Sequence, residues 1–171
     1  LREHDRSLAK SIRCGLENAS GKDFVIMDSD FNHQPKYLPF MVDSTRYYDC
    51  VIASRFVYGG NMNNPVRYIL SWFFNVFVRF TIGGKITDNL AGFFVIKRKT
   101  IEALNYNDIF YGYGDYCIRL LYYLQKKNID ILQVPTVYGE RMSGRGNSAF
   151  LKIFYQYSIA TLKLSFRERF N

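Results

Sequence analysis

The sequence predicts an α/β domain with a Rossmann-like, mainly parallel sheet. Short continuous apolar runs at residues 24–27 and 50–53 are typical of buried parallel strands, because a strand covered on both faces needs apolar side chains on both. Each run ends in polar residues, as strands do where their carboxyl ends border a crevice. At 171 residues and 48% hydrophobic, the chain is large enough to bury the core of one such domain.

The first predicted element is an amphipathic helix at residues 8–19, where apolar residues recur at helical spacing and a Ser-Gly pair then ends the helix. The two strands follow. The first strand is succeeded directly by Asp28 and Asp30, and the second by Arg55. Because the carboxyl ends of parallel strands meet at one edge of a sheet, we expect these groups of opposite charge to share that edge.

A longer helix is expected at residues 65–82, which are apolar on nearly every side. The exceptions recur every fourth residue and form one narrow polar stripe: Arg67, Ser71, Asn75 and Arg79. Two arginines, and a span shorter than the roughly 20 apolar residues that cross a bilayer, argue against a membrane-spanning helix. We expect this helix to be buried against the domain, with shallow insertion into a bilayer as the alternative.

The second half of the chain continues the alternation of strands and helices. A strand is predicted at residues 93–96, a helix at 116–125, and a last strand at 129–134 that is ended by Pro135. The glycine-rich residues 139–146 are predicted to form a mobile loop.

The final segment is predicted to be a basic amphipathic helix. Residues 149–170 carry apolar side chains at helical spacing together with Lys152, Lys163, Arg167 and Arg169. Such a helix suits the face of an anionic membrane. Packing on the domain core is an equally good interpretation, because amphipathicity alone does not separate the two.

The composition limits the partners of the chain. A formal net charge of +8 indicates an anionic partner: nucleic acid, an anionic lipid surface or a phosphorylated substrate. Nucleic acid is disfavoured, because the basic residues are dispersed and no known recognition motif is present. The three cysteines are far apart and odd in number, which argues against a disulfide framework or a zinc site and indicates reduced, cytosolic thiols.

Asp28 and Asp30 are candidate ligands for a divalent cation. Two carboxylates one residue apart at a strand end can point the same way, and their oxygen atoms suit the hard cations Mg²⁺ and Mn²⁺. Such a metal would bridge the oxygens of a diphosphate and neutralise charge as a nucleoside diphosphate departs. A structural turn cap is the alternative, since D-x-D sequences are common in turns.

Several sequence blocks occur in an order that is more specific than any single block. They are Arg6-Ser7-Leu8 with Ala19-Ser20-Gly21, Met27-Asp28-Ser29-Asp30-Phe31-Asn32-His33-Gln34-Pro35, Ser54-Arg55, Asp88-Asn89-Leu90-Ala91-Gly92-Phe93, and Val134-Pro135 with Arg141 and Gly144. Together they resemble the family-two glycosyltransferases, in particular the polyprenyl-phosphate (dolichol-phosphate) mannose and glucose synthases. The resemblance implies a glycosyltransferase A-type fold whose N-terminal, nucleotide-binding portion is missing from this sequence. Residues 1–148 would then be the C-terminal portion of the transferase domain, and residues 149–171 the basic amphipathic helix.

The resemblance also implies roles for individual residues. Asp28 and Asp30, with Asn32 as a further ligand, would hold Mg²⁺ or Mn²⁺ and the donor diphosphate. The expected phosphate-binding arginines are Arg6, Arg55, Arg141 and Arg145, whose planar guanidinium groups suit phosphate oxygens. The expected catalytic residues are Asp88 and Asp115, whereas His33 is expected to be structural.

The implied enzyme is an inverting glycosyltransferase at a cytoplasmic membrane surface, in peripheral contact with the membrane. Its donor would be a nucleotide sugar of the GDP-mannose or UDP-glucose type, and its acceptor a polyprenyl or dolichyl phosphate. Gly146-Asn147 stands where relatives usually have Ser-Lys, which leaves a saccharide hydroxyl open as the acceptor, with Asp115 as its base. A haloacid dehalogenase-type phosphatase fits poorly, because Asn32 stands where that motif has Thr or Val. A non-catalytic, membrane-associated binding module remains the non-enzymatic alternative.

Overall fold

The computed structural model describes residues 7–139 and 150–170. Its centre is a four-stranded sheet in the order β1-β4-β2-β5, made of Asp23–Ile26 (β1), Phe94–Lys97 (β4), Cys50–Ser54 (β2) and Ile131–Pro135 (β5). β1 and β2 both pair antiparallel with β4, and β2 pairs parallel with β5. Three strands therefore run in one direction against β4, which confirms the predicted α/β class with its Rossmann-like sheet.

β1 differs from its prediction as a buried parallel strand. Within the described residues it is bonded only to β4, in antiparallel register, and so lies at an edge of the sheet. Val25 is 42% exposed, as the outer side of an edge strand allows. The expectation for the strand ends is confirmed, because β1 and β2 run the same way and bring Asp28 and Arg55 to the same edge.

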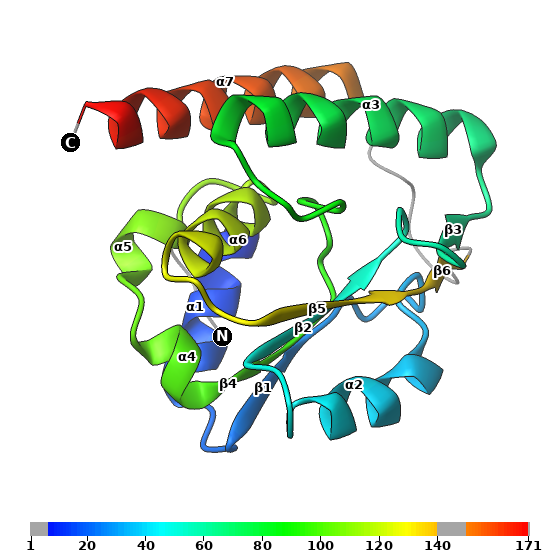
Figure 1. Cartoon of the computed structure of the whole chain (residues 1–171), viewed down its shortest axis with the longest axis vertical. Helices are drawn as coiled ribbons and strands as arrows, with labels where there is room; N and C mark the ends of the chain where they lie inside the picture. The colour runs from blue at the N-terminus through cyan, green and yellow to red at the C-terminus, as the bar shows by residue number, and fades with distance from the viewer. Residues whose placement is uncertain (1–6, 140–149, 171) are drawn as a thin grey trace.

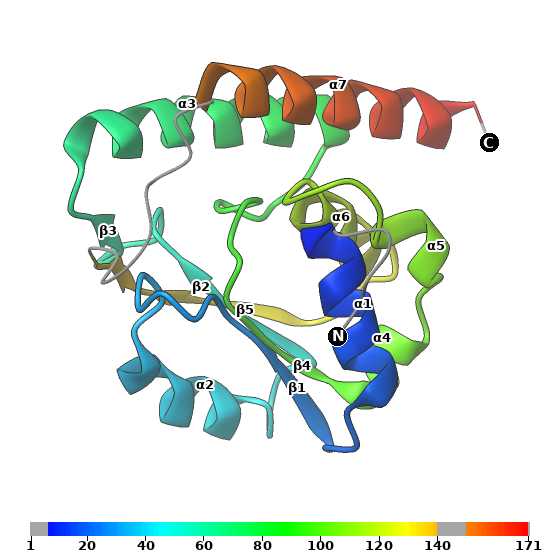
Figure 2. The same ribbon diagram turned by 180° about the vertical axis from the view of Figure 1, so that it is seen from behind.

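Helices cover both faces of the sheet (Figures 1 and 2). One face packs against α1 (Leu8–Asn18) and α6 (Tyr116–Lys126), and the other against α2 (Leu38–Ser44). Side chains alternate along the strands, as the pleat requires. Those that face α1 and α6 are Cys50, Ile52, Phe94 and Ile96. Those that face α2 are Val51, Ala53, Phe93 and Val95.

Shorter elements connect these layers. A 3-10 turn, η1 (Pro35–Tyr37), leads into α2, and α4 (Arg98–Glu102) and α5 (Tyr106–Ile109) link β4 to α6. Two-residue strands β3 (Asn61–Met62) and β6 (Val137–Tyr138) pair parallel with each other. The helices and strands predicted around the sheet are thus confirmed, whereas most of the predicted glycine-rich loop lies outside the described residues.

Helix α3 (Pro65–Ile82) has the predicted bounds, and local chemistry explains them. The Asn64 side chain caps the start by accepting a hydrogen bond from the Arg67 backbone N–H at 2.9 Å, and Pro65 occupies the first turn. Gly83 ends the helix in the left-handed conformation at φ 69°, which glycine adopts without a steric penalty.

α3 and α7 (Phe150–Arg169) form a separate layer above the rest of the domain (Figures 1 and 2). They run side by side in the same direction: Phe154 packs on Phe74, and further along Ser165 donates a hydrogen bond of 2.8 Å to the Thr81 carbonyl. Tyr157 and other apolar residues of the two helices join α6 in one buried cluster. No helix in the described ranges combines the length and the hydropathy needed to cross a membrane.

α3 is buried against the domain, as expected, but along one face only. The helix turns the middle of its polar stripe inward, where Ser71 and Asn75 are 8% and 1% exposed, and leaves apolar side chains outside. The exposed apolar residues of α3 are Val66, Ile69, Leu70, Trp72, Phe73 and Phe80. Asn75 accepts a hydrogen bond from the Asn89 backbone N–H, so the helix turns this polar side chain inward together with the apolar Phe74 and Val78.

Candidate functional site

A cavity of about 750 Å³ opens between the carboxyl ends of β1 and β2 and the layer formed by α3 and α7. Its polar side, at the strand ends, is lined by Asp28, Asp30, Asn32 and Arg55. The side formed by α3 and α7 is lined mainly by the apolar Val66, Leu70, Phe74, Ile153, Phe154 and Tyr157, together with Arg67 and Ser71. The cavity therefore offers charged groups for an anionic ligand and an apolar wall for a hydrophobic one.

The Asp28–Asn32 turn is tightly built. Phe31 has a left-handed backbone with φ 62°, which is uncommon for a bulky residue and is a form of strain that concentrates at functional sites. Asp30 Oδ1 accepts a hydrogen bond from the Asn32 backbone N–H at 3.0 Å, and Asp28, Asp30 and Asn32 all line the cavity. The turn therefore directs the two carboxylates toward one space.

His33 fixes the start of this turn. Its Nδ1 accepts a hydrogen bond from the Asp28 backbone N–H at 3.0 Å, and its ring stacks on Phe93 at 5.5 Å between centroids. A Cβ atom at Gly92 would lie 3.1 Å from His33 Cε1, so any larger residue there would have to push the ring aside by a few tenths of an ångström. Burial lowers the pKa of His33, although the Asp28 carboxylate opposes the shift. A neutral imidazole is the form that can accept this bond.

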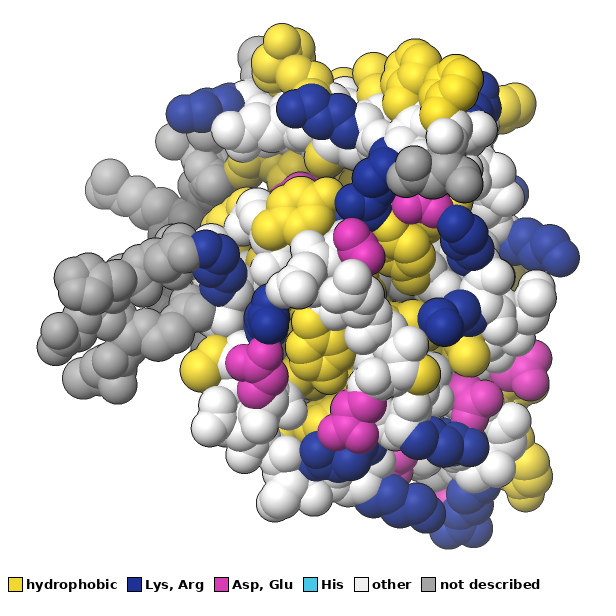
Figure 3. Space-filling model, turned by 90° about the vertical axis from the view of Figure 1, so that its left-hand side faces the viewer, with side chains coloured by type: hydrophobic (Ala, Val, Ile, Leu, Met, Phe, Trp, Pro, Cys, Tyr) yellow, Lys and Arg dark blue, Asp and Glu magenta, His cyan; other side chains and the backbone are white. Residues whose placement is uncertain are grey.

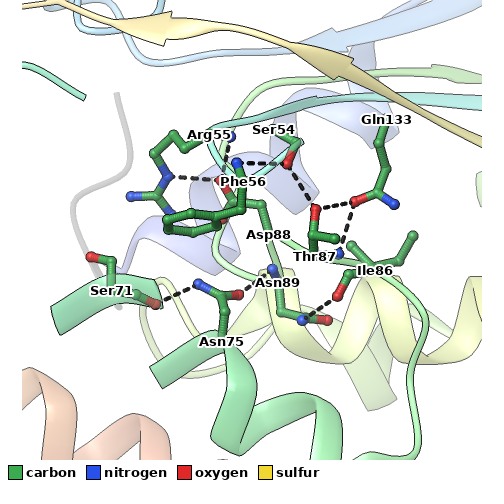
Figure 4. A network of polar contacts seen from close by, with 10 residues as sticks. All are labelled: Ser54, Arg55, Phe56, Ser71, Asn75, Ile86, Thr87, Asp88, Asn89 and Gln133. Carbon is green, nitrogen blue, oxygen red and sulfur yellow. Dashed lines mark hydrogen bonds and ion pairs between the residues drawn. The ribbon is translucent and has the colours of Figure 1, made fainter. Parts of the chain in front are cut away.

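Arg55 and Asp88 form a buried ion pair (Figure 4). Arg55 donates from Nε and Nη2 to the two Asp88 oxygens, at 2.7 and 2.6 Å, and its backbone N–H donates to Oδ2 at 3.1 Å. Burial alone would lower the pKa of Arg55, but the Asp88 carboxylate more than reverses this effect. Arg55 lines the cavity, whereas Asp88 is 0% exposed and is not among the lining residues. Asp88 is thus placed to orient Arg55.

A polar network holds the segment that carries Asp88 (Figure 4). The Thr87 backbone N–H and hydroxyl both donate to Gln133 Oε1 of β5, at 2.8 and 2.6 Å, and Ser54 and Thr87 share a hydrogen bond of 3.0 Å. On the other side of Asp88, the Asn89 backbone N–H donates to Asn75 Oδ1 of α3 at 2.6 Å. The Arg55 ion pair is therefore tied to both the sheet and α3.

Asp115 holds a loop together. Its carboxylate accepts hydrogen bonds from the Tyr113 backbone N–H at 2.7 Å and from Arg119 Nη1 at 2.5 Å. Arg119 is 2% exposed and also donates to the backbone carbonyls of Ile109 and Tyr111. Tyr113 lines the cavity, but Asp115 is not among its lining residues. The pair thus shapes the loop that borders the cavity.

The residues of the turn fit a hard divalent ion. No cluster of three or more His, Cys, Asp or Glu side chains occurs in residues 7–139 and 150–170, so protein carboxylates alone would not complete a coordination sphere. Two carboxylates that face a cavity wide enough for a diphosphate match a site whose remaining ligands are phosphate oxygens and water. Asp28 and Asp30 meet that description, and Asn32 lines the same cavity.

Of the nine predicted site residues, four share the cavity: Asp28, Asp30, Asn32 and Arg55. The predicted catalytic residues Asp88 and Asp115 are not among its lining residues and are bonded to Arg55 and Arg119. Arg6, Arg141 and Arg145 lie outside the described residues, so their predicted phosphate-binding roles stay predictions.

Two residues, one beside the cavity and one that shapes its bordering loop, were not predicted from the sequence. Arg119 stands on the inward face of a predicted helix, four residues after Asp115, a spacing that allows an ion pair within one turn. That spacing is the sequence signal from which the ion pair of Asp115 and Arg119 could have been predicted. Tyr138 lines the cavity, with Arg55 4.9 Å from its ring centroid, and no motif pointed to it.

The fold and the cavity together define an α/β domain of the glycosyltransferase A type. Glucosyl-3-phosphoglycerate synthase from Mycobacterium tuberculosis, solved with Mn²⁺, UDP-glucose and glycerol 3-phosphate, superposes with a TM-score of 0.66 at 20% identity, over 94% of this chain and 55% of that one. The structure of the same enzyme with phosphoglyceric acid superposes with a TM-score of 0.69 at 18% identity, over 96% of this chain and 56% of that one.

The chain belongs to glycosyl transferase family 2, because the model of that family matches residues 1–104. An undecaprenyl-phosphate mannosyltransferase of Micrococcus luteus is 34% identical over 137 residues, covering 78% of this chain and 55% of the relative. A dolichol-phosphate mannosyltransferase of Pyrococcus furiosus is 27% identical over 158 residues, covering 90% of this chain and 44% of the relative. The predicted resemblance is confirmed, and the chain spans about half the length of these relatives.

Proposed function

We propose that this chain is part of an inverting glycosyltransferase that moves a sugar from a nucleotide-sugar donor to a polyprenyl phosphate at a cytoplasmic membrane surface. The donor would be of the GDP-mannose or UDP-glucose type. The observation that carries the proposal is one cavity with two unlike sides: Asp28, Asp30 and Arg55 on one, and mainly apolar side chains of α3 and α7 on the other. Polyprenyl-phosphate mannosyltransferases among the relatives support the acceptor class.

Asp28 and Asp30 would hold Mg²⁺ or Mn²⁺, which supplies Lewis-acid help to the departing nucleoside diphosphate. Arg55, fixed in direction by Asp88, would bind an oxygen of the same diphosphate with the part of its guanidinium that Asp88 leaves available. An acceptor phosphate oxygen would form a bond to the anomeric carbon while the bond from that carbon to the diphosphate oxygen breaks. The leaving diphosphate takes the electron pair. The anomeric configuration inverts because the acceptor oxygen attacks the face of the carbon opposite to the leaving group.

A phosphate acceptor agrees with the hydrogen bonds that Asp115 makes. Such an acceptor is already ionised at neutral pH, so no side chain has to remove a proton before attack. Asp115, the predicted base for a hydroxyl acceptor, is bonded instead to Arg119 and the Tyr113 backbone. This arrangement favours the polyprenyl phosphate over the saccharide hydroxyl.

A peripheral membrane contact would bring the acceptor to the cavity. Exposed apolar side chains of α3, such as Trp72 and Phe73, share the layer with Tyr155 and Phe166 of α7. Figure 3 shows hydrophobic side chains over the upper surface of the molecule, where this layer lies, with basic side chains beside them. This combination suits insertion among anionic lipid headgroups.

Sugar transfer from GDP-mannose and from UDP-glucose to polyprenyl phosphate, in detergent with Mn²⁺, tests the proposal. We expect product with one donor from the unsubstituted chain and a loss of at least roughly 100-fold for Asp30→Ala, since metal and electrostatic help to a leaving group has that size. Product formed only on a saccharide acceptor would contradict the lipid assignment. Binding to lipid vesicles without Mn²⁺-dependent nucleotide binding would indicate a non-catalytic module instead.

A further inference from the structure

Tyr138 carries a buried hydroxyl group that has no hydrogen-bond partner among the described residues. The residue is 4% exposed and is held by the pairing of β6 with β3. Buried hydroxyl groups in folded proteins are nearly always bonded, because leaving one unpaired loses the hydrogen bond it made to water. An unpaired hydroxyl beside a binding cavity therefore needs an explanation.

The contacts of Tyr138 place it on the polar side of the cavity. Its ring lies edge-on to His33 at 4.8 Å between centroids, and the Arg55 guanidinium lies over it at 4.9 Å. Burial raises the pKa of Tyr138, and the Asp88 carboxylate adds to this effect, as Asp28 also does. The hydroxyl is therefore a neutral donor among the groups that the proposed diphosphate site uses.

The neighbouring acceptors do not engage this hydroxyl, which has no partner among the described residues. Both oxygens of the nearby Asp88 carboxylate are bonded to Arg55. A neutral donor between an arginine and a metal-binding turn complements an anionic oxygen, because a hydrogen bond to a charged acceptor is about twice as strong as one between neutral groups.

We propose that the Tyr138 hydroxyl donates a hydrogen bond to an oxygen of the bound diphosphate, alongside Arg55. This inference rests on the proposed function, because it assumes a diphosphate at Asp28 and Asp30. Tyr138 would be a ligand-binding residue, and its hydroxyl serves the ligand rather than the fold.

Thr136 provides a matched control. Its hydroxyl is also buried without a partner among the described residues, in a side chain that is 1% exposed, two positions before Tyr138. Thr136 is not among the residues that line the cavity. Tyr138→Phe and Thr136→Val each remove one unpaired hydroxyl with little change of shape, so they differ mainly in whether the residue lines the cavity.

The experiment measures the melting temperature without ligand and the Kd for GDP, UDP, GDP-mannose and UDP-glucose in the presence of Mn²⁺, for the full chain and both variants. Both substitutions should leave the melting temperature unchanged or raise it by about 2–4 °C, since an unsatisfied polar group is removed. Tyr138→Phe should weaken nucleotide binding roughly tenfold, the size of one hydrogen bond to a charged group. Thr136→Val should bind as the unsubstituted chain does.

The outcomes separate this inference from the function on which it rests. If the unsubstituted chain binds neither nucleotide with Mn²⁺, the proposed function fails and the inference fails with it. If it binds but Tyr138→Phe binds equally well, only the role of Tyr138 is overturned. A lower melting temperature of Tyr138→Phe would show that the hydroxyl bonds within the fold. A loss confined to GDP-mannose or UDP-glucose, with GDP and UDP unaffected, would move the contact to the sugar and overturn the diphosphate assignment.

Discussion

Asp88 shows how a single buried carboxylate governs the site. It is completely buried, and both of its oxygens are bonded to Arg55. Removing one partner of a buried ion pair is costly because the other charge is left uncompensated. The role that this geometry suits is to aim the Arg55 guanidinium at the cavity.

Asp88→Asn should therefore lower stability and donor binding together. The expected loss in the free energy of unfolding is about 3–5 kcal/mol, the size measured for broken buried ion pairs. Urea denaturation measures this loss, and titration with Mn²⁺ and GDP or UDP should show weaker binding in the variant that is still folded. A variant with unchanged stability would contradict the buried ion pair.

Asp115→Asn separates a structural from a catalytic role. The amide can still accept hydrogen bonds, but it leaves the buried Arg119 without a counter-charge, so we expect a lower melting temperature. With polyprenyl phosphate as acceptor, turnover measured well below that melting temperature should fall less than about tenfold. A loss of roughly 10²–10⁴-fold in the folded variant would identify Asp115 as a general base and favour a hydroxyl acceptor.

At the scale of elements, α3 connects the outer layer to the site. Asn75 accepts the hydrogen bond of the Asn89 backbone N–H at 2.6 Å and donates to the Ser71 carbonyl at 2.9 Å, next to the segment that holds Asp88. The helix therefore positions the Arg55 ion pair through its inward edge (Figure 4).

Asn75→Leu should weaken binding of Mn²⁺ and nucleotide although Asn75 is not among the residues that line the cavity. It leaves the buried Asn89 N–H unpaired, which costs about 1–3 kcal/mol, and it loosens the segment that carries Asp88. Asn75→Asp keeps an acceptor oxygen and should recover part of the binding. Equal binding by Asn75→Leu and the unsubstituted chain would show that the network does not reach Arg55.

The sequence predicted where helices and strands form, but not which of them lie next to one another. Apolar runs and helical spacing predicted α3 and the strands, because these patterns follow from local geometry. The antiparallel insertion of β4 between β1 and β2 could not be predicted, since pairing depends on contacts far apart in the chain. The rotation of α3 was missed for the same reason: the partner of Asn75 lies at Asn89, outside the helix.

For the site too, local sequence patterns were predicted and contacts between distant residues were not. Asp28 and Arg55 were found because both follow apolar strands whose carboxyl ends meet at one edge. The bonding of Asp88 to Arg55 was not foreseen, because 33 positions separate the two residues and no pattern links them. Tyr138 carried no sequence signal either, since an unpaired hydroxyl can be recognised only from its surroundings.

At the scale of the whole molecule, the chain separates a polar reaction site from an apolar outer layer. Exposed aromatic residues gather on α3 and α7, whereas Phe40 of α2 is the one exposed aromatic residue among the described residues of the sheet and of α1, α2 and α6. Large exposed apolar patches usually mark an interaction surface. Basic residues on the same helices, such as Arg79, Lys163 and Arg169, favour an anionic lipid surface.

Flotation with vesicles that contain anionic lipid tests this surface. Phe73→Ser on α3 should reduce the bound fraction, and the double variant with Trp72→Ser should reduce it further, because each removes an inserted aromatic ring. Phe40→Ser on α2 is the matched control, since Phe40 and Phe73 are both 60% exposed. Equal losses in the α2 and α3 variants would argue against a docking face on α3.

The central claim is that Asp28 and Asp30 hold a divalent ion to which a nucleoside diphosphate binds. Electron paramagnetic resonance of free Mn²⁺, measured during titration of the chain with and without GDP or UDP, tests it directly. We predict that a nucleoside diphosphate strengthens Mn²⁺ binding to about one ion per chain, and that Asp30→Asn abolishes this gain. Mn²⁺ binding that is the same with and without nucleotide, or the same in Asp30→Asn, would contradict the account.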